Sequence, residues 1–461
     1  MRYKILSVFG ALAAITACAD LTSINQNPNG PVDVPPPSIL PSVIQTVVGT
    51  VNGVDALNIR GGGLWVQYYS EIQYRDEDKY IVRSGTSGGW GLYRAALEDL
   101  QRIIVKGQAA NTPNWSAVGR ILKSYTYSVM TDAMGDLPYS QALKGDTNLA
   151  PAYDTQQQIY TGMLADLAQA NTDINPAGIG FASGDLMYNG DMTKWRKFAN
   201  SLRLRLAIHL SIKDPAKAAT EAAAAVTAGV FTSNADNATL LYLSTSPNRN
   251  PIYNDAQGRD DYGLSKTYVD SLTSWADPRL PVFAQPNPAG TGYQGLPNGL
   301  NDGEGTPIVN ISRFGAFWRS TAAAPMDLLT YSEVLFLQAE AAERGWIPGG
   351  SAAAATFYNN AITASMQQYG VGGGAAAYLA QQKVQYDSAV QPVGPPPPTV
   401  QRGHLQQIAY QKWVSLFMQG MESWTEVRRT RVPLLIPGLR AAFGAGVPGR
   451  IPERLPPKNR Y

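Results

Sequence analysis

The helical spacing of apolar residues constrains the fold of this chain more than any other feature. Between 115 and 130, apolar residues recur at intervals of three and four, which places them on one face of a helix. These residues are Val118, Ile121, Leu122, Tyr125 and Val129. The same kind of spacing returns along most of the chain, so helices are expected to build the core.

Three longer stripes predict helices at 193–211, 327–345 and 406–429. We interpret the stripe of the last one as core rather than as a ligand-binding box; it comprises Tyr410, Trp413, Val414, Phe417, Met421 and Trp424. Further helices are expected at 42–57, 64–73, 90–106, 155–170, 215–228 and 353–369. Strand signals are few and short, at 79–82 and 238–243. The predicted fold is therefore mainly α-helical.

Between 244 and 325 the helical period fails, and Pro, Gly, Asn and Asp dominate. A loop tract of this length in a compact domain is usually functional or disordered. Its aromatic residues argue against disorder; they are Tyr253, Trp275, Tyr293, Phe314, Phe317 and Trp318. Loops that carry aromatic and turn residues are common places for binding sites, so we expect a binding protein.

The N-terminus contains Cys18, the only cysteine of the 461-residue chain. One thiol forms no internal disulfide, and with only two histidines a Cys/His zinc site is nearly excluded. A basic start and an apolar stretch from 5 to 17 are typical of a signal peptide. Ile15-Thr16-Ala17-Cys18 resembles a bacterial lipobox, which predicts lipidation of Cys18. The alternative is an ordinary secretory signal with an incidental cysteine.

This interpretation divides the chain into three parts. Residues 1–17 are the expected lipoprotein signal peptide, 18–41 the lipidated cysteine and a proline-rich tether, and 42–461 a single helical domain. No later apolar run reaches the roughly 18 residues of a membrane helix, so only the lipid is expected to touch the membrane. The formal net charge of +2 gives no electrostatic indication of a nucleic-acid partner.

Four segments together resemble a known family. They read "DAMGDLPYSQAL" (132–143), "YNGDMTKWRKFANSLRLRLA" (188–207), "LTYSEVLFLQAEAAERGW" (329–346) and "QKWVSLFMQGMESWTEVRRTRVP" (411–433). The chain is similar in these segments to the SusD/RagB nutrient-binding outer-membrane lipoproteins, in the SusD-like branch. Arg431 departs from the pattern, because it stands where the family resemblance leads us to expect a glycine.

The resemblance implies a scaffold of tetratricopeptide-like helix pairs and a loop-rich half that carries the ligand site. It implies an oligosaccharide or peptide ligand and a TonB-dependent, SusC-like barrel as the partner, at the cell-surface side of an outer membrane. It implies no catalysis. No cofactor and no metal-binding residues are expected. Asn200, Ser201, Arg203 and Arg205 lie within an apolar helix, so any that are buried need hydrogen-bond partners such as Glu333, Glu340 or Glu343.

In the family the ligand site is built largely from loops, which here correspond roughly to 74–90 and 250–320. A sugar or peptide needs flat apolar faces and fixed polar groups. The candidates are Tyr74, Arg75, Asp78, Tyr80, Trp90, Tyr293 and Trp318. For each of them the alternative is a side chain that packs its own loop in place.

Two other functions are open at this point. Gly85-Thr86-Ser87-Gly88-Gly89 matches the G-x-S-x-G elbow of a serine hydrolase, with His209 or His404 as the possible base. That fold needs a series of parallel strands, and this chain has helices in their place. A glycoside hydrolase would need two carboxylates that flank the scissile bond. Glu340 and Glu343 share a helix face, but nothing in the sequence places them in a cleft. The other alternative is a helical-repeat scaffold for protein interactions.

Overall fold

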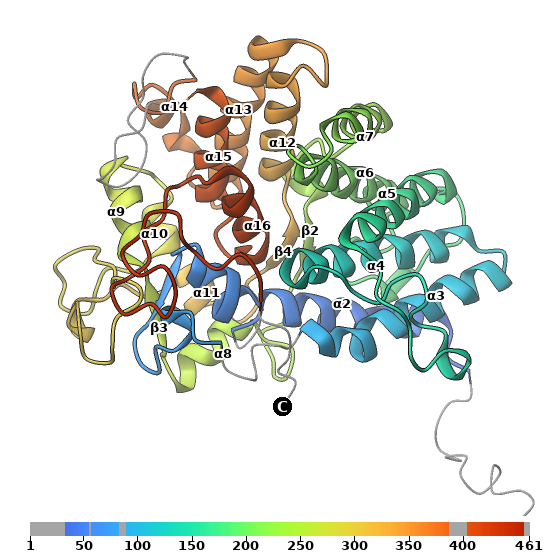
Figure 1. Ribbon diagram of the computed structural model, residues 1–461, viewed down its shortest axis with the longest axis horizontal. Helices are drawn as coiled ribbons and strands as arrows, with labels where there is room; N and C mark the ends of the chain where they lie inside the picture. Colours follow the sequence, from blue (N-terminus) through green and yellow to red (C-terminus); the bar gives the residue numbers. More distant parts are fainter. Residues whose placement is uncertain (1–32, 55–56, 83–88, 387–402, 456–461) are drawn as a thin grey trace, which may run out of the picture.

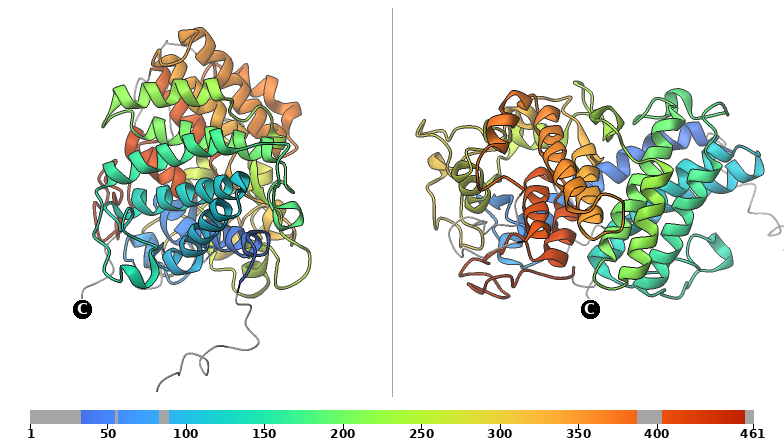
Figure 2. Two further views of the ribbon diagram at one scale, coloured as in Figure 1. Left: turned by 90° about the vertical axis from the view of Figure 1, so that its right-hand side faces the viewer. Right: turned by 90° about the horizontal axis from the view of Figure 1, so that it is seen from above.

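The computed structural model describes residues 33–54, 57–82, 89–386 and 403–455, and its elements are mostly helices (Figure 1). One half of the molecule is a stack in which each helix packs against the next. The stack consists of α3 (Glu98–Ala109), α4 (Pro113–Met134), α5 (Gln156–Asp173), α6 (Met192–His209) and α7 (Pro215–Ala228). Figure 2 shows these helices as one layered block. The helices expected at 90–106, 115–130, 155–170, 193–211 and 215–228 are thereby confirmed.

Side-chain caps explain where several of these helices begin. Thr155 accepts a hydrogen bond from the Gln158 amide, and Gln158 reaches back to the Thr155 amide, which forms a capping box before α5. The Asp191 carboxylate accepts from the amides of Thr193 and Lys194 at the start of α6. Polar residues at these positions therefore fix the boundaries that the apolar spacing alone leaves open.

A second group of helices completes the scaffold. It consists of α12 (Tyr331–Glu343), α13 (Gly350–Gln368), α14 (Ala375–Leu379), α15 (His404–Ser415) and α16 (Gly420–Thr430). α12 packs against α13 and α15 and also against α6, which joins this group to the stack. α2 (Pro36–Asn52) begins earlier than expected and lies along the lower part of the molecule in Figure 1, in contact with α3.

Two small antiparallel ladders correct several expectations. β1 (Tyr69–Glu71) pairs with β3 (Tyr262–Leu264), so the helix predicted at 64–73 is wrong beyond its first turn. β2 (Ala238–Leu240) confirms the first half of the strand expected at 238–243, and it pairs with β4 (Met326–Leu329). The helix predicted from 327 therefore starts only at Tyr331. Backbone pairing between segments distant in sequence overrides local helical spacing at both places.

The strand predicted at 79–82 is also wrong. Glu77–Lys79 form one 3₁₀ turn (η2), and Tyr80 after it has a left-handed φ of 67°. A residue in that conformation ends a helical turn and cannot continue into an extended strand. The structure thus places a tight turn where the sequence suggests a strand.

The long helix predicted at 406–429 is broken between α15 and α16. Met418 has a φ of 71°, and Gly420 lies against the backbone of Gly63 and the side chain of Asn58. The Gly420 amide donates to Asn58 Oδ1 over 2.7 Å. A side chain at 420 has no room there, so this close approach of two backbones requires glycine and sets the break.

The loop-rich half lies at the left of Figure 1 and is ordered by short elements and aromatic packing. Its helices are α8 (Pro251–Gly258), α9 (Lys266–Ser274), α10 (Leu280–Phe283) and α11 (Ala316–Arg319). Tyr268 of α9 stacks on Phe417 at 5.0 Å between ring centroids and meets Trp413 edge-on at 5.2 Å. The stripe of the C-terminal helices is therefore core, as expected. Within the described residues, the helices are all too short or too polar to cross a bilayer.

Candidate ligand-binding site

The described parts of the two loops expected to carry the site lie side by side, and residues 83–88 of the first loop fall outside the described residues. The β1–β3 ladder joins them at one end, and Ser265 bridges to Leu296 beside it. Farther along, Arg75 Nη1 donates to the carbonyl oxygens of Asn301 at 2.7 Å and Glu304 at 2.9 Å. We call the surface formed by residues 69–80 and 293–304 the two-loop face. Its two segments are far apart in sequence and are held together by backbone acceptors.

Arg75 and Asp78 hold this face together from inside. Asp78 is 1% exposed and accepts hydrogen bonds from Ser70 Oγ at 2.8 Å, from the Gly299 amide at 3.2 Å and from Asn298. Burial raises the pKa of the Asp78 carboxyl to about 6, although these donors act in the opposite direction. Arg75 is 3% exposed. Both side chains form their hydrogen bonds within the protein. This agrees with the alternative in which they hold their own loops in place rather than contact a ligand.

Tyr74 has the most exposed ring of the seven candidates. The residue is 54% exposed, and its backbone has a left-handed φ of 58°. The Arg259 guanidinium lies 5.7 Å from the ring centroid, and Arg259 Nε donates to Asp261 Oδ2 at 2.6 Å. A cation held against one part of an exposed aromatic ring fixes its orientation. This arrangement suits a flat surface on which a sugar ring stacks.

Tyr80 and Tyr293 are half-buried beside the same loops. Burial raises the pKa of the Tyr80 phenol, so this hydroxyl stays protonated at neutral pH. Tyr293 precedes Gln294, whose carbonyl accepts from the Ser312 amide at 2.8 Å. Each ring packs partly against the core and leaves an edge at the surface.

Trp90 belongs to a different aromatic group. It stacks on Tyr93 with 5.7 Å between the centroids and an interplanar angle of 19°, and it meets Tyr153 at 6.2 Å. Tyr153 comes from the loop between α4 and α5 and is 62% exposed. The sequence interpretation missed Tyr153, because a single aromatic in a proline-containing loop gives no periodic signal.

Trp318 is 2% exposed and packs edge-on against Phe317 and Tyr369. It lines a pocket of about 260 Å³ between the stack and the loop-rich half. Asp327 in the same pocket accepts from Thr239 and from Gln368 Nε2, and burial raises its pKa to about 6. Of the residues that line this pocket, the sequence interpretation named only Trp318 as a ligand candidate, because Asp327 and Gln368 fall within expected helices.

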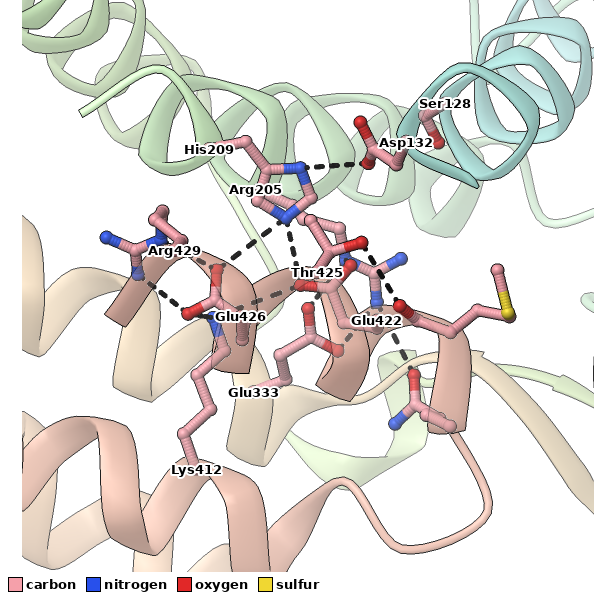
Figure 3. Close-up of polar contacts among 12 residues, drawn as sticks. Ser128, Asp132, Arg205, His209, Glu333, Lys412, Glu422, Thr425, Glu426 and Arg429 are labelled. Carbon is pink, nitrogen blue, oxygen red and sulfur yellow. Dashed lines mark hydrogen bonds and ion pairs between the residues drawn. The ribbon is translucent and has the colours of Figure 1, made fainter. Parts of the chain in front are cut away.

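Charged side chains of α4, α6, α12, α15 and α16 form an ion-pair network around α16 (Figure 3). His209 Nε2 lies 3.0 Å from Glu422, and one ligand atom from each of His209, Glu422 and Glu426 lies within 4.8 Å of the others, a spacing that suits a metal ion. However, Lys412 Nζ lies 3.0 Å from Glu426, and Arg205 lies 3.3 Å from Glu422. Since these cations already neutralise the carboxylates, the cluster fits a structural role better than a metal site.

The hydrolase alternative gains no support from the described residues. Ser87 lies outside them, and the sheets within them are both two-stranded and antiparallel. His209 is bound to Asp132 and Glu422, and His404 Nδ1 lies 2.8 Å from Glu343. Both histidines that could act as the base are thus held by carboxylates within the scaffold.

Comparison with known proteins agrees with this architecture. A family model described as "Starch-binding associating with outer membrane" matches residues 28–456. Among solved structures, a chitin-binding protein is 29% identical, with a TM-score of 0.72 over 87% of this chain and 88% of that one. A chitin-binding SusD homologue from Flavobacterium johnsoniae is 26% identical, with a TM-score of 0.76 over 88% of each chain. A SusD homologue from Bacteroides fragilis is 25% identical, with a TM-score of 0.74 over 87% and 88%. Curated proteins gave no match.

Proposed function

Since this chain belongs to the SusD-like family, we propose that it binds a nutrient glycan at the cell surface and passes it to a TonB-dependent transporter of the outer membrane. The family is associated with the outer membrane. The names of two solved relatives refer to chitin and the family description refers to starch, which supports a glycan rather than a peptide as the ligand.

The two-loop face is the observation that carries this proposal. Its exposed ring, Tyr74, is oriented by Arg259, and its inner contacts through Arg75 and Asp78 hold both loops in place. A preformed aromatic surface binds a sugar ring with little loss of conformational entropy. We place Tyr74 and Tyr293 in contact with the ligand, with Tyr80 beside them, and assign Arg75 and Asp78 to support of the loops.

Trp90 and Tyr153 offer a second stacking surface. The two rings are tilted by 56° to each other, so they present two faces to a bent chain of sugars. Trp318 is placed differently, because it lines the 260 Å³ pocket and exposes only 2% of its surface. We assign it to the packing of the loop-rich half around that pocket.

The lipid anchor and the transporter partner complete the proposal. Cys18 lies outside the described residues, and its lipobox-like context supports an anchor at the mature N-terminus, ahead of the tether and the single domain from 42 to 461. The transporter partner rests on family membership. Its test is a pull-down of the full chain from detergent extract, which is expected to recover a large outer-membrane barrel. Repeated recovery of a soluble helical partner instead favours the scaffold alternative.

We also propose that the protein is not an enzyme. The solved relatives named above are described as binding proteins or homologues of them, and the described residues include no parallel sheet for a hydrolase elbow. The test is a fluorophosphonate probe on the full chain together with an esterase assay. Stoichiometric labelling of Ser87 with turnover would support the hydrolase alternative.

A direct experiment on ligand class uses calorimetry with chitohexaose, maltoheptaose and a set of short peptides. Trp90→Ala and Tyr153→Ala are compared with the parent against the best glycan. Loss of stacking on one ring is expected to weaken binding about fivefold, a difference of roughly 1 kcal/mol. Binding of peptides alone would contradict the glycan assignment.

A further inference from the structure

A second cavity lies away from the two-loop face, at the ends of α4, α6 and α16 and the starts of α5 and α7. Its volume is about 760 Å³, within the usual range for ligand pockets. Its charged lining includes Asp132, His209, Lys213, Asp214, Lys217 and Arg428. We call it the basic pocket, because cations outnumber acids on its wall.

Three of these cations have no carboxylate partner within the described residues. Lys217 Nζ donates to Thr161 Oγ1 at 2.9 Å, and Lys213 is exposed and takes part in no ion pair of the described chain. Arg428 donates to the carbonyl oxygen of Glu453 at 2.6 Å and to Thr425 Oγ1 at 3.0 Å. Burial lowers the pKa of the Arg428 guanidinium, as expected where a cation is desolvated without full compensation.

The acids of the pocket are already engaged. Asp132 accepts from the Tyr160 hydroxyl at 2.6 Å and lies 3.3 Å from His209 Nδ1. Asp214 accepts from the Lys217 amide at 3.1 Å, which caps α7. The Asp132 carboxylate therefore interacts with His209 and the Asp214 carboxylate with a helix end. Lys213 and Lys217 line the cavity without a carboxylate partner among the described residues, whereas Arg428 lies 3.8 Å from the centroid of the Trp424 ring.

The donor set favours an oxyanion that is attached to a polar molecule. Ammonium and guanidinium groups bind carboxylate and sulfate through charge-assisted hydrogen bonds. The side-chain amides of Gln156 and Gln157 also line the pocket, and an amide both donates and accepts, as a sugar hydroxyl does. The Tyr160 ring is 5% exposed, so the wall offers little aromatic surface for stacking. Recognition here rests on charge and hydroxyl contacts.

We propose that the basic pocket is a second ligand site, which binds the carboxylate or sulfate groups of an acidic oligosaccharide. This site is distinct from the two-loop face, where stacking dominates. It would let one protein hold a glycan whose acidic units are recognised separately from its neutral rings.

The test is calorimetry on the full chain in detergent. Trigalacturonate, neutral galactotriose, triglutamate and sodium sulfate are titrated into the parent, into the double variant Lys213→Gln/Lys217→Gln and into Lys266→Gln. Lys266 is an exposed lysine in the loop-rich half, so its variant controls for loss of charge. Trigalacturonate is expected to bind the parent at least about tenfold more tightly than galactotriose. The double variant is expected to lose about tenfold, the control less than about twofold, and added salt to weaken binding.

Several outcomes overturn the proposal. Equal binding of trigalacturonate to the parent and the double variant would exclude the two lysines as ligand groups. Equal or tighter binding of triglutamate would assign the pocket to acidic peptides, and a response to sulfate alone would indicate an unspecific ion site. Chitohexaose serves as the separate readout, since its binding at the two-loop face is expected to be the same in the parent and the double variant.

Discussion

Arg205 of α6 and Glu333 of α12 form a buried bidentate ion pair across 128 residues of sequence. Arg205 Nε and Nη2 each lie 2.6 Å from a different oxygen of the Glu333 carboxylate. Arg205 Nη2 also donates to the Leu328 carbonyl at 2.9 Å. The pair joins the helical stack to the C-terminal helices, and it confirms the expectation that a buried arginine of α6 is paired with a glutamate of α12.

Removal of this arginine is expected to destabilise the fold strongly. Arg205→Met leaves the Glu333 carboxylate buried without its partner, which costs about 3 to 5 kcal/mol. Arg203→Met is the matched control, because Arg203 of the same helix pairs with Glu221 of α7, its side chain is 15% exposed against 2% for Arg205, and its loss costs about 1 kcal/mol or less. Urea denaturation followed by circular dichroism measures both. Equal destabilisation by the two variants would contradict the assigned role.

Stability is expected to fall at alkaline pH through His209. Desolvation alone lowers the pKa of this imidazole, but the carboxylates of Glu422 and Asp132 outweigh it and raise the pKa from 6.5 to about 10. A raised folded-state pKa gives stability that is complete below pH 6.5 and is lost as the pH rises towards 10. The difference in unfolding free energy between the parent and His209→Gln should therefore shrink by about 3 to 5 kcal/mol across that window. A difference that stays constant with pH would contradict the charged state.

Arg431 adopts the conformation for which the family pattern suggests glycine. It ends α16 with φ 58° and ψ 29°, and its side chain forms an exposed pair with Glu453 at 2.7 Å. Both Arg431→Gly and Arg431→Ala remove that pair, but only glycine takes the left-handed conformation without steric cost. The glycine variant is expected to be more stable than the alanine variant by about 1 kcal/mol in thermal and urea unfolding. Equal stabilities would indicate that the turn relaxes on substitution.

The helices of the stack could be predicted because their signals are local. α7 begins and ends where the sequence indicates, since Pro215 starts it and Gly229 follows it with a φ of 97°. The break before α16 could not be predicted, because it depends on the contact of Gly420 with Gly63, more than half the chain away. Phe417 and Met421 keep helical spacing across that break, so the pattern continues where the helix does not.

The site was predicted as two loops, and burial decided which residues of those loops are exposed. Tyr74 and Arg75 are adjacent in the sequence and were both candidates for ligand contact, yet Tyr74 is 54% exposed and Arg75 only 3%. The difference arises because Arg75 donates to the carbonyl oxygens of Asn301 and Glu304. These contacts join residues far apart in the sequence, so no local pattern predicts them. The polar residues of α6 show the same limit: Asn200 bonds to Asn171 at 2.9 Å, and Ser201 accepts from the Phe231 amide, rather than reaching a glutamate of α12.

Cys18→Ser is expected to release the protein from the membrane fraction. The lipobox-like residues before Cys18 predict that the thiol carries the lipid, and acyl chains supply nearly all of the affinity for the bilayer. Cell fractionation and incorporation of labelled palmitate measure the change. Tight membrane association of the variant with continued labelling would contradict the anchor.

Binding of a neutral glycan at the two-loop face is the central claim, and calorimetric titration of chitohexaose and maltoheptaose into the parent and Tyr74→Ala tests it most directly. Trp346→Ala is the control. The Arg344 guanidinium lies 5.2 Å from the Trp346 ring centroid, much as Arg259 lies against Tyr74, but Trp346 lies in the turn after α12, away from the two-loop face. At least one glycan is expected to bind the parent, with affinity about fivefold weaker in Tyr74→Ala and changed less than about twofold in Trp346→Ala. Folded Tyr74→Ala protein that binds as tightly as the parent, or a parent that binds neither glycan, would contradict the claim.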